Sequence, residues 1–396
     1  MSTSIESHDL YDLYRDLDAR LAEERYAEIE EGPVQAKEEE AKYSLSQWQL
    51  MWRKYVRNRA ALIGGIVIVL FYVVALFGNF VAPYTLTTRF RDRLYLAPQR
   101  IHFFDAGRFS PFVYGAQTKL DLETFEQITV TDYDTKYPIR LFIQGEPYRL
   151  LGLIEMDRHL FGAVGGVVNI LGTEQQGRDM FTRIVLGSQV SLTIGLIGVA
   201  LSLILGTILG VISGYYGGRT DNLIQRLIEL VRSFPSIPLW MALSAAIPPT
   251  WPPMRVYFGV TIILSLIGWT WLARQLRGLV LSLRGQDFVM AAKLMGASDR
   301  RLVFRHLIPA TTGQIIVVAT LAMPSMILAE TALSFLGLGL QPPITSWGVL
   351  LREVQNLQSI ALYPWVFSTV FFIVAAVLAF NFMGDGLRDA ADPYTR

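Results

Sequence analysis

The stretch VSLTIGLIGVALSLILGTILGVISGYY, residues 190–216, contains no charged residue. A bilayer core needs about 20 predominantly apolar residues in a helix, so this stretch is long enough to cross it. Small residues recur in it every four positions: Gly198, Ser202, Gly206, Gly210 and Gly214. Residues four apart share one helix face, and a stripe of small side chains lets another helix backbone approach closely. The stripe predicts a helix inside a bundle, packed within this chain or against another subunit.

The composition around this stretch is that of a membrane protein. Of 396 residues, 52% are hydrophobic and 17% are charged, whereas soluble chains carry about 25% charged residues. The net charge of +1 gives no electrostatic support for binding nucleic acid. The chain has no cysteine, which excludes disulfides, thiolate metal sites and a cysteine nucleophile.

Further apolar runs predict five more membrane spans. They lie at residues 60–82, 233–247, 256–273, 315–340 and 363–383. The run at 233–247 is short and is interrupted by Pro235 and Pro238. We therefore expect an all-α integral membrane protein with six transmembrane helices and both ends on one side.

The distribution of Lys and Arg predicts the orientation, because short cytoplasmic loops are enriched in these residues. A basic stretch precedes the first span, and the connection between the fourth and fifth spans carries Arg274, Arg277, Arg284, Lys293, Arg300, Arg301 and Arg305. The loop after the third span has only Arg255. This predicts that the N-terminus, residues 274–310 and the C-terminus are cytoplasmic, and that residues 83–188 are extracytoplasmic.

The patterns divide the chain into five parts. Residues 1–43 are acidic and predict a cytoplasmic helix or tail, and 44–59 predict an amphipathic helix lying in the headgroup plane. The first transmembrane helix covers 60–82, and an extracytoplasmic insert covers 83–188. Alternation around residues 138–151 predicts some β structure in that insert. A core of the remaining transmembrane helices would occupy 189–396, with a cytoplasmic loop at 284–310.

Motifs for bond chemistry are missing. No lysine follows a glycine, so there is no phosphate-cradling loop, and the chain cannot hydrolyse ATP by itself. The four histidines are not at helical-turn spacing, and there is no Gly-x-Ser-x-Gly motif. We expect no catalytic residue and no metal site.

One acidic residue, Glu330, lies inside an apolar span, where an ionisable group is costly and normally faces a bundle interior or a water-filled path. It could line a route for solute or be a hydrogen-bonded group that joins helices. Pro324 and Pro235 break backbone hydrogen bonds within spans, which is typical of helices that move or line a pore. These three residues are the candidates for a translocation path.

The cytoplasmic loop predicts a compact knob of two short helices. Residues 287–295 form the first, Gly296 ends it, Ser298 or Asp299 caps the second, and Pro309 ends that one. The small side chains of Ala291 and Ala292 would let a partner sit close to the backbone. The alternative is an ordinary basic loop.

Residues 290–309, MAAKLMGASDRRLVFRHLIP, resemble the "EAA" loop of bacterial binding-protein-dependent ABC importer permeases. Four further segments resemble the C-type permease subunit of the dipeptide and oligopeptide family: LGTEQQGRDMFTRIVLGSQVSL (171–192), GYYGGRTDNLIQRLIELVRSFPSIP (214–238), LSFLGLGLQPPITSWG (333–348) and FNFMGDGLRDAADP (380–393). The resemblance runs from about residue 44 to the end. Met290 stands where the family usually has glutamate, and the insert at 83–170 is longer than usual.

The resemblance implies a type I ABC importer permease in the bacterial inner membrane that imports peptides. It implies that the loop docks into an ATPase subunit through Ala291, Ala292, Gly296, Ala297, Asp299 and Arg300. Implied partners are a homologous B-type permease, two ATPase subunits that are identical or different, and an extracytoplasmic solute-binding protein. ATP and Mg²⁺ would bind the ATPases, and this chain would hold no cofactor.

Other functions remain open from the sequence. The same machinery carries oligosaccharides, opines, glutathione or nickel complexes in related systems. A non-transporting membrane scaffold or sensor would use the acidic N-terminal segment and the insert, but it would not need a docking loop. Secondary transport driven by ions would need intramembrane ion ligands beyond Glu330.

Overall fold

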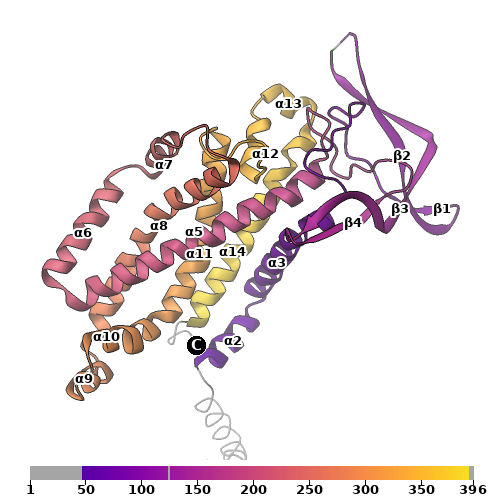
Figure 1. Cartoon of the computed structure of the whole chain (residues 1–396). Coiled ribbons are helices and arrows are strands. Elements are labelled where there is room, and N and C mark those ends of the chain that lie inside the picture. Colours follow the sequence, from indigo (N-terminus) through magenta and orange to yellow (C-terminus); the bar gives the residue numbers. More distant parts are fainter. Residues whose placement is uncertain (1–46, 124, 392–396) are drawn as a thin grey trace, which may run out of the picture.

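The computed structural model describes residues 47–123 and 125–391. Long helices run side by side in a bundle, and a β-sheet lies at one end of it (Figure 1). The short helices α9 (Asp287–Leu294) and α10 (Asp299–Leu302) lie at the opposite end. The predicted acidic segment, residues 1–43, lies outside the described residues.

The first described helices lead from the end opposite the sheet toward the sheet (Figure 1). Helix α2 (Gln47–Arg57) exposes Trp48 and Trp52, and α3 (Arg59–Leu76) follows it directly. Asn58 begins α3 as its N-cap, because its side chain accepts a hydrogen bond from the Ala61 amide at 3.2 Å. Helix α4 (Gly78–Val81) extends α3 by one turn.

A four-stranded antiparallel sheet follows, in the order β1 (His102–Asp105), β2 (Arg108–Leu120), β3 (Gln127–Leu150) and β4 (Ile154–Ala163). The long strand β3 pairs with β2 through its first half and with β4 through its second half. A small core of buried Val113, Ala163 and Val168 lies under the sheet.

Helices α5 (Met180–Tyr216) and α8 (Pro253–Leu283) form the centre of the bundle and run in the same direction. Between them come α6 (Gly218–Ser233) and α7 (Ser236–Ala245). Gly217 and Gly218 have φ of +63° and +54° in the sharp turn that separates α5 from α6. Side chains other than glycine rarely adopt this conformation.

The remaining helices complete the bundle. After α10 come a π-helical turn η1 (Val303–Leu307), α11 (Ile308–Phe335), α12 (Trp347–Glu353), α13 (Leu357–Leu362), the 3₁₀ turn η2 (Pro364–Ser368) and α14 (Thr369–Ala391). The largest buried apolar cluster joins residues of α5, α8, α11, α12 and α14. Tyr55 of α2 and Ala390 of α14 share a smaller cluster, so the two ends of the described chain lie together.

The expectation that Pro309 ends the second helix of the knob is wrong. Residues 299–335 form one continuous helical segment, and Pro309 lies in the first turn of α11. The π-helical turn immediately before it changes the backbone pairing, so the missing amide of Pro309 does not break the helix.

Within the described residues, five helical segments are long and apolar enough to cross a membrane: Arg59–Leu76, Met180–Tyr216, Pro253–Leu283, Asp299–Phe335 and Pro364–Ala391. They match five of the predicted spans. At the remaining one, 233–247, the structure has the ten-residue helix α7, which alone is too short to span. Pro235 is its N-cap residue and separates it from α6.

Candidate functional site

The stripe of small residues on α5 faces other helices of the same chain. A Cβ atom at Gly206, Gly210 or Gly214 would lie 2.9, 2.6 or 2.7 Å from a backbone carbonyl oxygen of α8. Ser202 donates a hydrogen bond to the Ser265 carbonyl of α8 at 3.0 Å, and Gly198 faces Met326 of α11. The stripe therefore holds the backbones of α5 and α8 together, which is the closest kind of helix contact.

A cavity of about 720 Å³ opens beside this contact. Its lining comes from α5, α8 and α11 and from the region where α6 gives way to α7. Among the lining residues are Ser202, Arg232, Phe234, Ser236, Trp240, Thr270, Trp271, Ser325 and Met326. Aromatic and aliphatic side chains supply most of the surface, hydroxyl groups supply polar contacts, and Arg232 is the one charged side chain in this described lining.

The three residues predicted for a translocation path are not among the residues that line this cavity. Pro235 lies between the lining residues Phe234 and Ser236, and Pro324 is buried next to the lining residue Ser325. Glu330 is fully buried.

Glu330 is the centre of a network of serines. Its carboxylate accepts hydrogen bonds from the hydroxyls of Ser346 at 2.7 Å, Ser334 at 2.8 Å and Ser191 at 3.2 Å. Each serine oxygen also accepts a backbone amide, from Val349, Leu340 and Trp347 respectively. The network joins α5, α11 and the start of α12, and it satisfies the acceptors of a buried carboxylate.

The knob at the other end of the bundle has the glycine turn and the Ser298 cap that its sequence predicts. Helix α9 ends at Leu294, and Gly296 follows with a φ of +82°. The amides of Gly296 and Ala297 donate to the carbonyls of Lys293 and Ala292, which completes the turn. Ser298 then caps α10 by accepting a hydrogen bond from the Arg301 amide.

The two faces of the knob differ. Val289 and Ala292 are buried against Val211 of α5, Val280 of α8 and Leu307, and Ala297 packs at the edge of this cluster. Ala291, Gly296, Asp299 and Arg300 are exposed, and so are Leu294 and Met295 at 86% and 82%. Ala292 therefore belongs to the contact that fixes the knob to the bundle, and the free apolar surface is at Leu294 and Met295.

Polar contacts strengthen the attachment of the knob. Tyr215, at the end of α5, donates its hydroxyl hydrogen to the Asp299 carboxylate at 2.6 Å. Nearby, Arg277 of α8 donates two hydrogen bonds to Asp221 of α6 at 2.5 and 2.6 Å. The hydrogen bonds from Arg277 hold the pKa of Asp221 below its ordinary value. Helices α5, α6 and α8 are thus joined beside the knob.

At the sheet end, an ion-pair cluster fixes α12 to the start of α5. Glu353 accepts hydrogen bonds from Arg183 at 2.9 Å and from Arg178 at 3.2 Å, and Arg178 also donates to Glu174 at 2.8 Å. Burial favours a raised pKa for Glu353, but the hydrogen bond and charge of Arg183, with the charge of Arg178, bring the pKa below its ordinary value.

Asp179 begins α5 and links it to the insert. Its carboxylate accepts hydrogen bonds from the Thr182 amide at 2.7 Å and from the Asn169 side chain at 2.9 Å. Asn169 in turn accepts a hydrogen bond from Arg93 at 3.0 Å. Burial raises the pKa of Asp179 to about 6, although its hydrogen bonds oppose the shift.

The residues that join α12, α5 and the insert at the sheet end were not predicted from the sequence. Arg178, Arg183 and Glu353 are charged residues close to apolar spans, and this position was the available signal. Their pairing is visible only in three dimensions, because Arg183 and Glu353 lie 170 residues apart. Among the described residues, no group of three or more His, Asp or Glu side chains could hold a metal ion.

Comparison with known proteins now adds to this geometry. Residues 206–396 match the model of the family described as "Binding-protein-dependent transport system inner membrane component". Residues 46–98 match the "N-terminal TM domain of oligopeptide transport permease C".

Three relatives illustrate the likeness. The Bacillus subtilis "Oligopeptide transport system permease protein OppC" is 38% identical over 57% of this chain and 72% of its own. The Bacillus subtilis "Dipeptide transport system permease protein DppC" is 30% identical over 89% of this chain and 88% of its own. The Pectobacterium atrosepticum "Glutathione transport system permease protein GsiD" is 36% identical over 56% of this chain and 72% of its own. With two long stretches of the chain matching these models and relatives, the chain belongs to the inner-membrane permease subunits of binding-protein-dependent ABC importers, in the oligopeptide and dipeptide permease group.

Proposed function

We propose that this chain forms half of the membrane pathway of an ATP-driven importer of peptides, coupled to its ATPase through the knob of α9 and α10. The observation that carries the proposal is the two-faced knob: an exposed apolar surface on a rigid attachment to the bundle. A homologous second permease would supply the other half of the pathway. Two ATPase subunits, which bind ATP and Mg²⁺, and an extracytoplasmic solute-binding protein would complete the complex.

The construction of the knob suits the transmission of movement. Leu294 and Met295 are available to a groove on an ATPase, while Val289 and Ala292 pack on α5, α8 and the start of α11. A displacement of the exposed face therefore reaches three long helices through close-packed contacts, which transmit strain because they have little free volume. Met290 is exposed on the same helix, so the absence of the usual glutamate changes a contact and leaves the knob's own core unaltered.

The parallel course of α5 and α8 supports six crossings. Between them the chain has to return across the membrane, and α6 with α7 is the connection that can do so. The third crossing is then a helix broken at Pro235, and its irregular backbone lies beside the cavity. Six crossings place α2 and the end of α14 on the side of the knob, which the Lys and Arg distribution assigns to the cytoplasm.

The cavity suits peptide cargo. Trp240, Trp271 and Met326 offer apolar surface for variable side chains, and Ser202 and Ser325 offer hydrogen bonds. Arg232 would attract a carboxylate, which every free peptide carries. Glutathione carries the same group, so the cavity alone does not separate the two cargoes, and one relative bears the name of a glutathione permease.

The sheet lies at the end where a solute-binding protein would dock in this orientation. We propose that it guides the binding protein onto the pathway and covers the outer ends of the helices. Exposed aromatic side chains such as Phe104, Phe109 and Tyr133 give it a surface for such a contact.

Transport by the reconstituted complex tests the proposal. Proteoliposomes with the two permeases and the ATPases, supplied with the binding protein and ATP, should accumulate a labelled peptide. The double variant Leu294→Glu, Met295→Glu should assemble but lose accumulation, because charge replaces the exposed apolar surface. Thr220→Glu is the control, since Thr220 is exposed on α6 outside the knob.

Three results would contradict parts of the proposal. Full accumulation in the double variant would remove the knob from the coupling route. Accumulation of glutathione but of no other peptide would keep the importer and change its cargo. A wild-type complex that hydrolyses ATP and moves no solute would favour a scaffold or sensor instead.

A further inference from the structure

The turn between β3 and β4 is made entirely of apolar residues and glycine. It reads LLGLI at residues 150–154, and four of these residues are exposed, with Leu153 at 84%. Leu151 has a φ of +53° and Gly152 a φ of +73°, so the chain uses leucine in a backbone conformation where water-exposed turns favour Gly, Asn or Asp. The turn therefore presents leucine side chains at positions where water-exposed turns usually carry polar residues or glycine.

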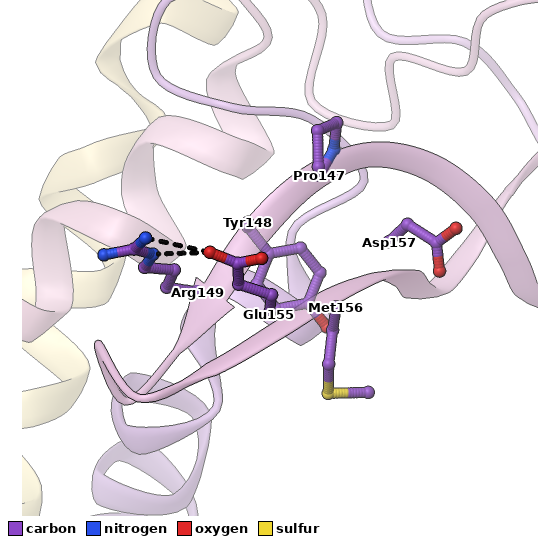
Figure 2. Close-up of a pocket in the computed structure, with 6 residues that line it drawn as sticks. All are labelled: Pro147, Tyr148, Arg149, Glu155, Met156 and Asp157. Carbon is purple, nitrogen blue, oxygen red and sulfur yellow. Dashed lines mark hydrogen bonds and ion pairs between the residues drawn. The ribbon is translucent and has the colours of Figure 1, made fainter.

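Charged residues flank this tip directly on both sides. Figure 2 shows Arg149 and Glu155 meeting across the two strands, with their side chains 2.8 Å apart. Tyr148 precedes Arg149, and its hydroxyl donates to the Arg158 carbonyl. An aromatic residue and a neutralised ion pair thus border a short uncharged segment, which is the sequence of groups expected at a membrane interface.

The hairpin contacts the end of the first membrane-spanning helix. The Asn79 side chain of α4 donates a hydrogen bond to the Arg149 carbonyl at 3.3 Å. The rings of Phe80 and Phe142 are 6.1 Å apart. Helix α4, which follows directly on α3, therefore fixes the height of the hairpin.

That height corresponds to the edge of the hydrocarbon layer. Residues 59–81 of α3 and α4 span roughly 34 Å at 1.5 Å per residue. A bilayer's hydrocarbon core is about 30 Å thick, so Asn79 lies near its boundary when the basic end at Arg59 lies near the other. Arg149 contacts Asn79, and the tip starts at the next residue, Leu150.

Helix α3 exposes apolar side chains up to the end that the hairpin contacts through α4. Val69, Leu70, Val73 and Leu76 are all exposed on this helix, and Phe77 follows them. In a membrane-spanning helix such a surface is covered by lipid tails or by another apolar helix. The tip exposes Leu151, Leu153 and Ile154 at the same end of α3.

We propose that the β3–β4 tip inserts into the lipid leaflet at the α4 end of α3. The insert is then fastened to the bilayer as well as to the helices, and the sheet is held at a fixed height and tilt. The occupant is lipid because the exposed apolar tip lies at the level where α3 ends, at the boundary of the hydrocarbon core. A solute-binding protein approaches from water and would not require an uncharged leucine turn at this level.

The absence of cysteine in this chain allows a direct test. In the assembled complex in lipid nanodiscs, a nitroxide attached to Leu153→Cys should collide more with oxygen, which concentrates in lipid, than with a water-soluble nickel chelate. Leu70→Cys on α3 is the membrane reference. Phe104→Cys in β1 is the water reference, measured without the solute-binding protein, since Phe104 is also exposed but lies on the strand farthest from β4. Labelling of the unsubstituted complex gives the background from partner subunits.

The proposal predicts that the oxygen-to-nickel ratio at Leu153 is several-fold above that at Phe104 and close to that at Leu70. A ratio equal to that at Phe104 would overturn it by placing the tip in water. An immobilised label shielded from both reagents would also overturn it, because a protein would then cover the tip. Neither readout depends on transport, so the result is independent of the proposed cargo and of coupling.

Discussion

Gly210 is a position where one missing methyl group decides how two helices meet. Its absent Cβ leaves room for the Ala273 carbonyl, and Gly206 and Gly214 do the same one turn away on each side. A larger residue must push a backbone rather than a flexible side chain. At the residue scale, contacts of this kind, the serine network of Glu330 and the cap at Asp179 fix the bundle.

Replacing Gly210 by alanine should therefore destabilise the protein, although alanine favours helix formation. Its Cβ would lie 2.6 Å from a carbonyl oxygen, and overpacking of this kind costs about 1 to 3 kcal/mol. Gly278→Ala is the matched control, because nothing lies within 4 Å of a Cβ at Gly278. The thermal midpoint should fall for Gly210→Ala and stay level or rise for Gly278→Ala. Equal midpoints would show that α5 and α8 do not touch as described.

Asp179 should make stability depend on pH. Its pKa of about 6 lies above the ordinary 3.8, so the folded protein holds this proton more tightly than the unfolded chain. The stabilisation that this proton gives the folded protein is fully present at pH values below the ordinary pKa and is lost as pH rises through about 6. Asp179→Asn keeps an N-cap side chain and removes the titration. As pH falls from about 7.5 to about 5, the thermal midpoint of the wild type should rise relative to that of the variant. A difference that stays constant with pH would refute this.

At the scale of elements, apolar runs in the sequence identified five long helices. The side-chain contacts that join these helices depend on residues distant in sequence. Pro309 was expected to end a helix, but the π-helical turn before it lets the helix continue through this proline. The glycine turn of the knob was predictable because a helix end of this kind depends only on a glycine at the right position, here Gly296. The role of Glu330 was not, because Ser191 lies 139 residues away and Ser346 lies on another element.

Loss of the Glu330 carboxylate should loosen three elements together. Glu330→Ala leaves the hydroxyls of Ser191, Ser334 and Ser346 without their acceptor, at about 1 to 3 kcal/mol for each buried group that finds no other partner. Glu330→Gln keeps one carbonyl acceptor and should lose less. Purified yield and thermal midpoint measure the effect, with Ser325→Ala on the cavity side as control. A Glu330→Ala protein as stable as the wild type would mean that the network does not hold α5, α11 and α12.

At the scale of the whole molecule, the proposed topology has the sheet and the knob on opposite sides of one membrane. Single cysteines in this cysteine-free chain test that placement. In intact cells or spheroplasts, an impermeant thiol reagent should label Leu122→Cys, which is 77% exposed beside the sheet, and should leave Arg301→Cys unlabelled until the membrane is opened. The reverse pattern would invert the topology.

Cross-linking from Leu294 tests whether the knob contacts an ATPase subunit. Leu294→Cys, carrying a short photoactivatable cross-linker in the assembled complex, should form an adduct with the ATPase subunit, and nucleotide should change its yield as the ATPases close. The same cross-linker at Leu122→Cys, at the sheet end, should form none. If the fully assembled complex gave no ATPase adduct at Leu294, or an equally strong one at Leu122, the knob would not be the site of coupling.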